Sequence, residues 1–208
     1  IDKSNNKIVG QKAYEKLFNN ASDKESANYK AEVKRLMGTA DTIHFERLNK
    51  SLTPEEVSAE ILISLKETVS RNYPDFSCVS AVITIPAYFS TLQSEATKRA
   101  GEIAGFKYVV LLQEPIAAAM AYGLNSTENQ NWLVYDLGGG TFDVALISSK
   151  DGILTVLGQN GDNHLGGKDF DLLIVDEVII PAIIEKYNLK AFDRSNISYQ
   201  AIFSRLKA

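Results

Sequence analysis

The sequence predicts an α/β fold, because apolar strand-like runs alternate with segments that carry helix-start signals. Residues 79–89 are a continuous run rich in β-branched side chains, residues 106–112 read as another strand, and each is followed by a segment with helix-start signals. Residues 132–157 then hold three more runs, separated by a glycine turn and by Asp151-Gly152, a strong hairpin signal. We therefore expect a mixed sheet with flanking helices.

The first of these runs, residues 79–89, is apolar at nearly every position and is closed by Pro86. A strand whose two faces are both apolar is typical of the centre of a sheet. We therefore expect a central strand here and a second strand at 106–112.

Helix boundaries follow from capping residues. Thr53–Glu56 and Ser90–Gln93 are capping boxes, and Pro54 occupies the first helical position. Pro115 starts a third helix, for which Gly123 is the expected C-cap. Apolar residues recur every four positions along one face of the first helix: Val57, Ile61, Leu65 and Val69.

The remaining helical predictions are more local. We expect a short helix at 11–18, a partly helical stretch from 25 that ends at Gly38, and a last helix over 169–187. Pro181 should kink or split that last helix, because it removes a backbone donor and clashes with the preceding turn.

Composition excludes several classes of protein. Of 208 residues, 45% are apolar and 23% charged, and the formal net charge is −4, so neither nucleic acid nor membrane is an expected partner. No run of 18 apolar residues exists. The single cysteine, Cys78, excludes an internal disulfide framework. The chain begins at Ile1 and stops within a helix-like segment, so we expect a fragment of a longer protein.

The stretch "LVYDLGGGTFDVALI" (133–147) is the clearest functional signal. Gly138, Gly139 and Gly140 remove every Cβ from the turn, so backbone N–H groups can approach an anion closely. The plainer interpretation is a tight hairpin whose glycines adopt positive φ. Asp136 and Asp143 favour the anion site, because two acids beside one turn repel each other unless a cation lies nearby.

The flanking residues suit a nucleotide's terminal phosphates. Asp136 can hold Mg²⁺ directly or through water, and Thr141 adds a hydroxyl. Two familiar phosphate motifs do not fit: "GDNHLGGKD" is one residue too long for a P-loop, and "GGGTFD" lacks the third glycine and the helix of a dinucleotide site.

Several linked motifs resemble the heat-shock protein 70 (DnaK-type) chaperones. In chain order they are "EVKRLMG", "AVITIPAYFSTLQSEATKRAGEIAGF", "LLQEPIAAAMAYGL", "VYDLGGGTFDVALI" and "NGDNHLGGKDFD". The resemblance implies part of an actin-like (ribonuclease H-like) ATPase domain, with residues 1–123 in the first lobe and 124–208 in the second. It also implies ATP or ADP, Mg²⁺ and a monovalent cation such as K⁺ between the lobes.

The resemblance implies a role for each matching residue. Gly138, Gly139, Gly140 and Thr141 would bind phosphates, and Gly166 and Gly167 would approach the nucleotide from the second lobe. Asp136, Asp143 and Glu114 would bind Mg²⁺ with its waters, or other cations. Lys34 would lie beside the γ-phosphate, with Glu114, Asp136 and Thr141 completing the catalytic group. Pro86 would relay the nucleotide state to a substrate domain.

Three residues depart from the family pattern. Ser94 replaces an arginine used in interdomain signalling, Ile116 replaces a threonine near the cleft, and Lys168 reverses the charge of an acid. The family's first phosphate loop, its adenine-binding helix and its client domain are not in this sequence. We therefore expect the chain to bind ATP weakly by itself.

The resemblance implies an ATP-dependent chaperone of the stress response, with unfolded client polypeptides, a J-domain co-chaperone and a nucleotide-exchange factor as partners. Its compartment would be the cytosol or an organelle lumen or matrix. One alternative is a heat-shock-110-like co-chaperone, in which ATP has a structural role. Another actin-like ATPase, such as a sugar kinase, is the second alternative.

Overall fold

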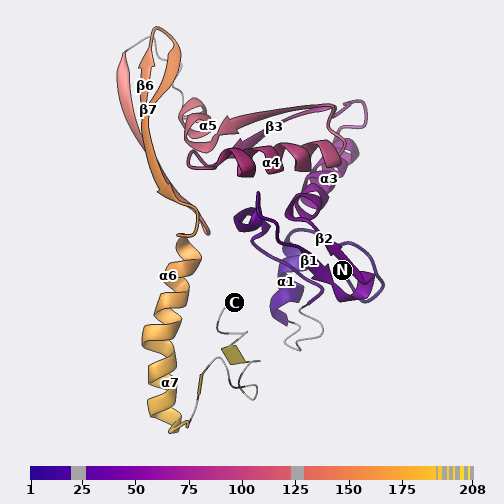
Figure 1. Ribbon diagram of the computed structural model, residues 1–208, viewed down its shortest axis with the longest axis vertical. Helices are drawn as coiled ribbons and strands as arrows, with labels where there is room; N and C mark the ends of the chain where they lie inside the picture. Colours follow the sequence, from indigo (N-terminus) through magenta and orange to yellow (C-terminus); the bar gives the residue numbers. More distant parts are fainter. Residues whose placement is uncertain are drawn as a thin grey trace. The chain divides into compact units, whose positions relative to one another are not determined.

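The structure is a computed structural model that describes residues 1–19, 27–122 and 129–190, and then residues 192, 193, 196, 199, 202, 203 and 206 (Figure 1). The chain forms two compact units. One consists of Glu32–Ile43 and Leu52–Gly166, and the other of Ile1–Ala31, His44–Ser51 and Gly167–Ala208. The lobe boundary expected near residue 123 stays a prediction.

The first unit contains a parallel strand–helix–strand motif. Strands β3 (Ser80–Ile85) and β4 (Tyr108–Gln113) pair in parallel along their whole lengths, and α4 (Thr91–Ile103) connects them and packs on both. Gly101 makes this packing close, because a Cβ there would lie 2.9 Å from a methyl of Val109 and 3.0 Å from one of Ile83. The two strands and the capping box of α4 are as predicted.

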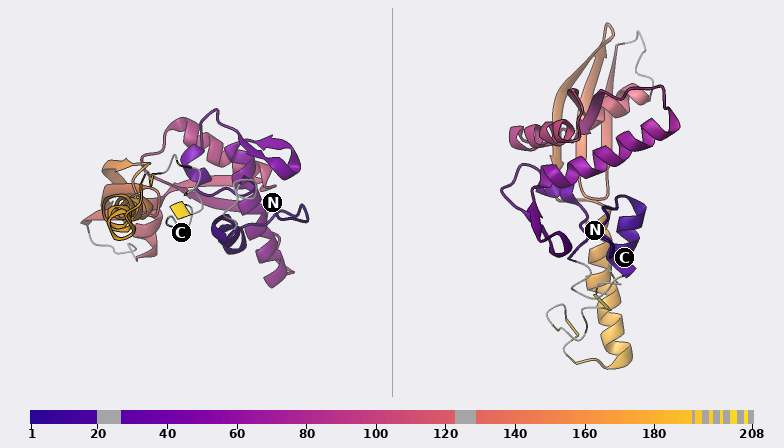
Figure 2. Two further views of the ribbon diagram at one scale, coloured as in Figure 1. Left: turned by 90° about the horizontal axis from the view of Figure 1, so that it is seen from below. Right: turned by 90° about the vertical axis from the view of Figure 1, so that its right-hand side faces the viewer.

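Helix α3 (Pro54–Asn72) begins with the predicted capping box and packs on α4 (Figure 2). Leu62 packs against Ala96 and Ala100 of α4, and Ala59, which is 1% exposed, packs with Ala104 and Phe106 just after that helix. The apolar face expected from the sequence is a different one: Ile61 and Leu65 on it are 46% and 58% exposed. Spacing alone indicates a stripe on the helix, and the position of α4 decides which side is covered.

The expected central position of the strand at 79–89 was wrong for the part of the chain that the structure describes. Among those residues β3 pairs with β4 alone. The side of β3 turned away from α4 is uncovered, with Val82 64% exposed.

A three-stranded antiparallel sheet follows in the same unit. Strands β5 (Gln130–Leu137), β6 (Phe142–Lys150) and β7 (Ile153–Asp162) are successive neighbours, as predicted. Asp151 (φ 53°) and Gly152 (φ 78°) make the second hairpin turn, both in the left-handed conformation that this dipeptide favours.

Helix α5 (Glu114–Ala121) contacts both sheets (Figure 1). Its Ala119 meets Ala145 and Ile147 of β6 in a core cluster, and Ile116, Trp132, Val134 and Leu154 pack around that cluster. The helix therefore joins the end of β4 to one face of the three-stranded sheet. The C-cap predicted at Gly123 lies outside the described residues.

A 3-10 helix, η1 (Val33–Leu36), completes this unit. Gly38 follows it with φ 76°, and a Cβ there would lie 2.7 Å from the backbone nitrogen of Gln93. The predicted end of the helical stretch at Gly38 is confirmed. Val33 is buried and η1 packs against α3, while Met37, just after η1, packs in a core cluster with Ala96 and Ala100 of α4.

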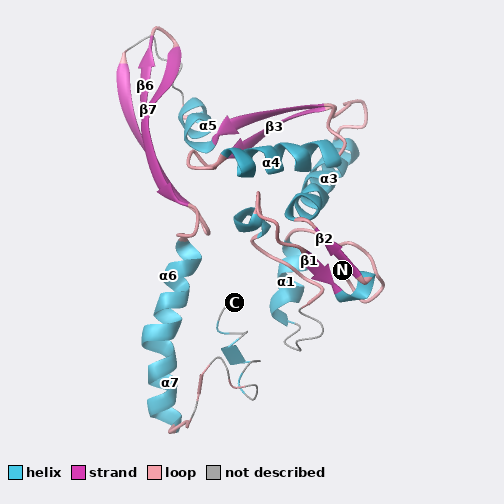
Figure 3. Cartoon of the chain, in the orientation of Figure 1, coloured by secondary structure: helices cyan, strands magenta, loops and turns pink. Residues whose placement is uncertain are grey.

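The second unit contains α1 (Gln11–Asn19), the 3-10 helix η2 (Glu46–Leu48) and a long C-terminal helical segment (Figure 3). The short strands β1 (Ile43–Phe45) and β2 (Lys50–Leu52) pair with each other at its edge. The helical segment is α6 (Gly167–Ile174), a π-helical turn η3 (Val175–Ile179) and α7 (Ile180–Tyr187). The irregular turn just before Pro181 confirms the predicted interruption, since proline cannot donate to the preceding turn.

A membrane crossing requires a helix that is both long and apolar. Within residues 1–19, 27–122 and 129–190, no helix combines these two properties.

Candidate functional site

The glycine turn connects β5 to β6. The N–H of Gly138 donates to the carbonyl oxygen of Thr141 at 2.9 Å, which leaves Gly139 and Gly140 at the tip. None of the three glycines, all of which the structure describes, lies in the left-handed φ region. Positive φ therefore does not explain why glycine occupies these positions, and the plainer interpretation of the turn loses its physical reason.

What surrounds the turn differs at each glycine. A Cβ on Gly139 would meet nothing within 4 Å, and the residue is exposed. A Cβ on Gly140 would lie 3.2 Å from Nε of Arg35. Gly166 lies so close that a Cβ on it would overlap the nitrogen of Gly140 and the carbonyl carbon of Gly139. The turn is thus bounded by Arg35 and Gly166 and open at Gly139.

The two acids beside the turn face each other across the ladder. Asp136 on β5 is the register partner of Asp143 on β6. Asp143 is 1% exposed, and Thr141, which directly precedes β6, is 9% exposed. The residue predicted to flank the turn with its hydroxyl is therefore buried, whereas Gly139 at the tip of the turn is exposed.

Burial raises the pKa of the Asp143 carboxyl above its ordinary value. The hydrogen bond from the N–H of Tyr88, at 3.3 Å, and the charge of Lys34 lower it, while the charges of Glu114 and Asp136 raise it further. The ionised form of Asp143 is therefore less favourable here than it would be in water. A cation beside these acids would offset that cost.

Lys34 and Glu114 are brought together, although 80 positions separate them in the sequence. The Nζ of Lys34 donates to Oε1 of Glu114 at 2.8 Å and lies 5.9 Å from the centre of the Phe89 ring. Lys34 comes from η1, and Glu114 is the first residue of α5. A carboxylate in the first turn of a helix also complements the helix dipole.

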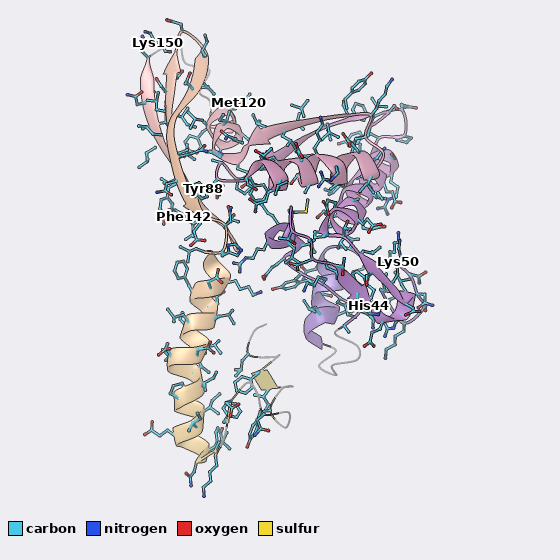
Figure 4. The ribbon with its side chains drawn as sticks, in the orientation of Figure 1. His44, Lys50, Tyr88, Met120, Phe142 and Lys150 are labelled. Atoms are coloured by element: carbon cyan, nitrogen blue, oxygen red, sulfur yellow. The ribbon has the colours of Figure 1, made fainter. Side chains whose placement is uncertain are left out.

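The backbone after Pro86 is bound to the three-stranded sheet by what we call the Ala87–Tyr88 contact. Gln159 donates to the carbonyl oxygen of Ala87 at 2.8 Å, and Asn163 donates to that of Tyr88 at 3.4 Å. Asp143 accepts from the N–H of Tyr88. Figure 4 labels Tyr88 and Phe142 at the end of the sheet where the glycine turn lies, and Lys150 at the opposite end. Pro86 itself is buried.

The role predicted for Gly167, the chain neighbour of Gly166, stays a prediction. Gly167 is the first residue of α6 and belongs to the other compact unit. In the ranges that the structure describes, no three His, Cys, Asp or Glu side chains converge to form a ready metal site. Asp136, Asp143 and Glu114 therefore interact through their charges without enclosing a common point.

Two of the departures from the family pattern take ordinary structural places. Ile116 packs beside the core cluster under α5, so its apolar side chain is used in packing. Ser94 lies in the first turn of α4, where its N–H donates to the carbonyl oxygen of Ser90. Lys168 lies in the first turn of α6.

Two residues at the site were not predicted from the sequence. Arg35 donates from Nε to the carbonyl oxygen of Gly140 at 3.1 Å, across 105 positions of sequence. Gln159 joins β7 to the Ala87–Tyr88 contact, and its Oε1 is 3.4 Å from Nε2 of Gln113. The one local signal was that Arg35 adjoins Lys34; nothing in the pattern of β7 distinguishes Gln159.

The order of the elements and the glycine turn, with Asp136, Asp143 and Lys34, define a class of protein. Comparison with known protein families identifies that class. Residues 3–202 match the family described as "Hsp70 protein", and the chain therefore belongs to the Hsp70 family. Membership confirms the recognition made from the linked motifs and the actin-like ATPase fold, of which this chain holds a part.

Two relatives show how close the likeness is. The chain is 47% identical over 188 residues to "Chaperone protein DnaK" of Metamycoplasma hominis, across 89% of this chain and 30% of that protein. It is 43% identical over 183 residues to "Chaperone protein DnaK" of Ureaplasma parvum serovar 3, across 88% of this chain and 29% of that protein. The chain thus spans just under a third of the length of these relatives.

Proposed function

We propose that this chain is part of the nucleotide-binding domain of an ATP-dependent molecular chaperone that assists protein folding. The observation that carries the proposal is the exposed glycine turn whose glycines need no positive φ, with the Lys34–Glu114 pair in the same compact unit. A backbone stripped of side chains and open at its tip suits an anion with several oxygens. The DnaK relatives support ATP as the source of that anion.

In this proposal the chain contributes position and charge to phosphoryl transfer. The N–H groups of Gly139 and Gly140 would donate to the terminal phosphates, and Lys34 would stabilise the charge that develops on the γ-phosphate oxygens. Glu114 holds Lys34 through the 2.8 Å ion pair. When the phosphates bind, Lys34 would exchange this carboxylate for phosphate oxygen.

The acids fit a cation site in their chemistry. Mg²⁺ is commonly held by one or two carboxylates with water and substrate phosphate completing its shell, so it needs no enclosed protein cage. Asp136 and Asp143, paired across the ladder, supply such carboxylates, and Glu114 lies within electrostatic range of Asp143. Mg²⁺ would neutralise phosphate charge there, and K⁺ would bind near Asp143.

The Ala87–Tyr88 contact supports a relay role for Pro86. Asp143 touches the backbone two residues beyond this proline, so a change in cation or phosphate at the turn would reach the segment after β3 through one hydrogen bond. The full-length protein would use this change to alter its grip on unfolded polypeptides, aided by a J-domain co-chaperone and a nucleotide-exchange factor.

The heat-shock-110-like alternative is not favoured. The relatives reported above carry the name DnaK, and their alignments with this chain cover 89% and 88% of its length. The sugar-kinase alternative is opposed by the match to the Hsp70 family over residues 3–202.

Single-turnover ATP hydrolysis by the full-length protein tests the proposal, with Lys34→Ala as the variant. Lys98→Ala, an exposed lysine on α4, is the matched control. We expect roughly a hundredfold loss of rate for Lys34→Ala, since groups that stabilise transition-state charge are typically worth that much, and no change for Lys98→Ala. Wild-type protein that does not hydrolyse ATP would refute the proposed function. An unchanged rate in Lys34→Ala would remove Lys34 from the catalytic group.

A further inference from the structure

Arg35 makes a contact that the proposed function does not yet use. Its Nε–H donates to the carbonyl oxygen of Gly140 at 3.1 Å in a partly buried setting. The guanidinium also lies against the Cα of Gly140, because a Cβ there would lie 3.2 Å from Nε and 3.5 Å from Nη2. A glycine at 140 therefore allows the arginine to approach the turn.

This bond fixes the orientation of one peptide group. Carbonyl and N–H point in opposite directions across a trans peptide, and no cis peptide occurs in the described chain. The N–H of Thr141 must therefore point away from Arg35 while the bond is made. Two adjacent glycines at the tip give this backbone more freedom than any other pair of residues would, so the peptide needs an external constraint to keep one orientation.

The helix η1 gives Arg35 a firm base. Val33 and Met37, on either side of it, are 5% and 3% exposed, and Met37 packs against α4. From this base Lys34 reaches Glu114 and Arg35 reaches Gly140. One short helix thus places two cations at two parts of the site, one at the start of α5 and one at the glycine turn.

We propose that Arg35 is a positioning residue that orients the Gly140–Thr141 peptide so that the turn presents its N–H groups to the terminal phosphates. This inference rests on the proposed function. Arg35 acts through Gly140 and does not itself need to touch the nucleotide. The hydrogen bond from Nε is the essential feature, and the positive charge is secondary.

Three substitutions separate the bond from the charge. In Arg35→Gln the amide nitrogen is the same number of bonds from Cα as Nε, so a neutral donor can reach Gly140. Arg35→Lys keeps the charge but has a methylene in place of Nε, and Arg35→Met has neither donor nor charge. Each variant is made in the full-length protein, and single-turnover hydrolysis of MgATP is measured at saturation.

We expect Arg35→Met and Arg35→Lys to slow hydrolysis by about tenfold, near the upper end of what losing one intramolecular hydrogen bond costs, and Arg35→Gln to recover most of that loss. Unchanged thermal midpoints in all three would exclude general unfolding. A rate near wild type in Arg35→Lys with a slow Arg35→Gln would overturn the inference in favour of charge. Three variants at the wild-type rate would overturn it entirely.

A nucleotide-free measurement tests the same inference without hydrolysis. The amide ¹⁵N and ¹H shifts of Thr141 should match wild type in Arg35→Gln and differ in Arg35→Met. Shifts that are the same in all variants would overturn the inference while leaving the proposed function intact. Wild-type protein inactive toward ATP would refute the proposed function alone.

Discussion

The substitution Gly139→Ala adds one methyl group at the open tip of the glycine turn. A Cβ there meets nothing within 4 Å, and the backbone has no left-handed φ to strain. Folding should therefore tolerate the change. Alanine also reduces the freedom of the unfolded chain, which stabilises compatible sites by about 0.4–1 kcal/mol.

Binding of MgATP should respond in the opposite direction. The methyl occupies the space through which a phosphate oxygen would approach the N–H groups of Gly139 and Gly140. Losing one hydrogen bond to a charged oxygen costs about 1.5–3 kcal/mol, which corresponds to roughly a 10- to 100-fold weaker Kd. The variant should thus be as stable as wild type, or slightly more so, and bind nucleotide poorly.

Gly158→Ala is the matched control for this variant. Gly158 lies on β7 and is exposed, and a Cβ added to it would also meet nothing within 4 Å. Thermal unfolding and calorimetric titration with MgATP are measured on both variants of the full-length protein. Wild-type affinity in Gly139→Ala would refute the reasoning. Equal loss of affinity in the two variants would show that the effect is not specific to the turn.

Three further predictions concern Gly166, Asp143 and Thr53. Gly166→Ala should destabilise the protein by about 2 kcal/mol, because its Cβ would overlap the backbone of the turn; an unfolding midpoint equal to wild type in denaturant would contradict the close approach. Asp143→Asn should be more stable than wild type at neutral pH without added Mg²⁺ or K⁺, since burial raises the pKa of this carboxyl and makes its ionised form less favourable than in the unfolded chain. That advantage should shrink as pH falls through the raised pKa, because wild type then gains stability by binding a proton, and a difference in Tm that does not vary with pH would be inconsistent with this cause. Thr53→Ala should lower the free energy of unfolding by about 1 kcal/mol through loss of the α3 capping box. A loss of only about a few tenths of a kcal/mol would show that the cap does not limit stability.

The features that depend on local rules could be predicted from the sequence. Both capping boxes form as expected, since Thr53 and Ser90 need only the residues three positions later. The hairpin at Asp151-Gly152 and the irregular turn before Pro181 follow from backbone restrictions of the residues themselves. The glycine turn was found in the same way, by its composition and its two acids.

The features that depend on contacts between residues far apart in the chain could not be predicted from the sequence. Arg35 and Gly140 meet across 105 positions, and Gln159 and Ala87 across 72, so no short motif contains either pair. The position of α4 determines which face of α3 is covered. Ile61 and Leu65, which belong to the predicted apolar face, remain exposed. The prediction that Lys34 lies at the phosphate site depended on the family motifs, because an isolated lysine gives no indication of its position in the fold.

The N–H groups at the tip of the glycine turn are proposed to bind the terminal phosphates of a nucleotide. Amide ¹⁵N–¹H spectra of the full-length protein, selectively labelled with glycine, can follow these groups during titration with MgATP. We expect the resonances of Gly139 and Gly140 to shift strongly and saturably while that of Gly158 stays in place. Saturating MgATP that leaves Gly139 and Gly140 unshifted would contradict that proposal.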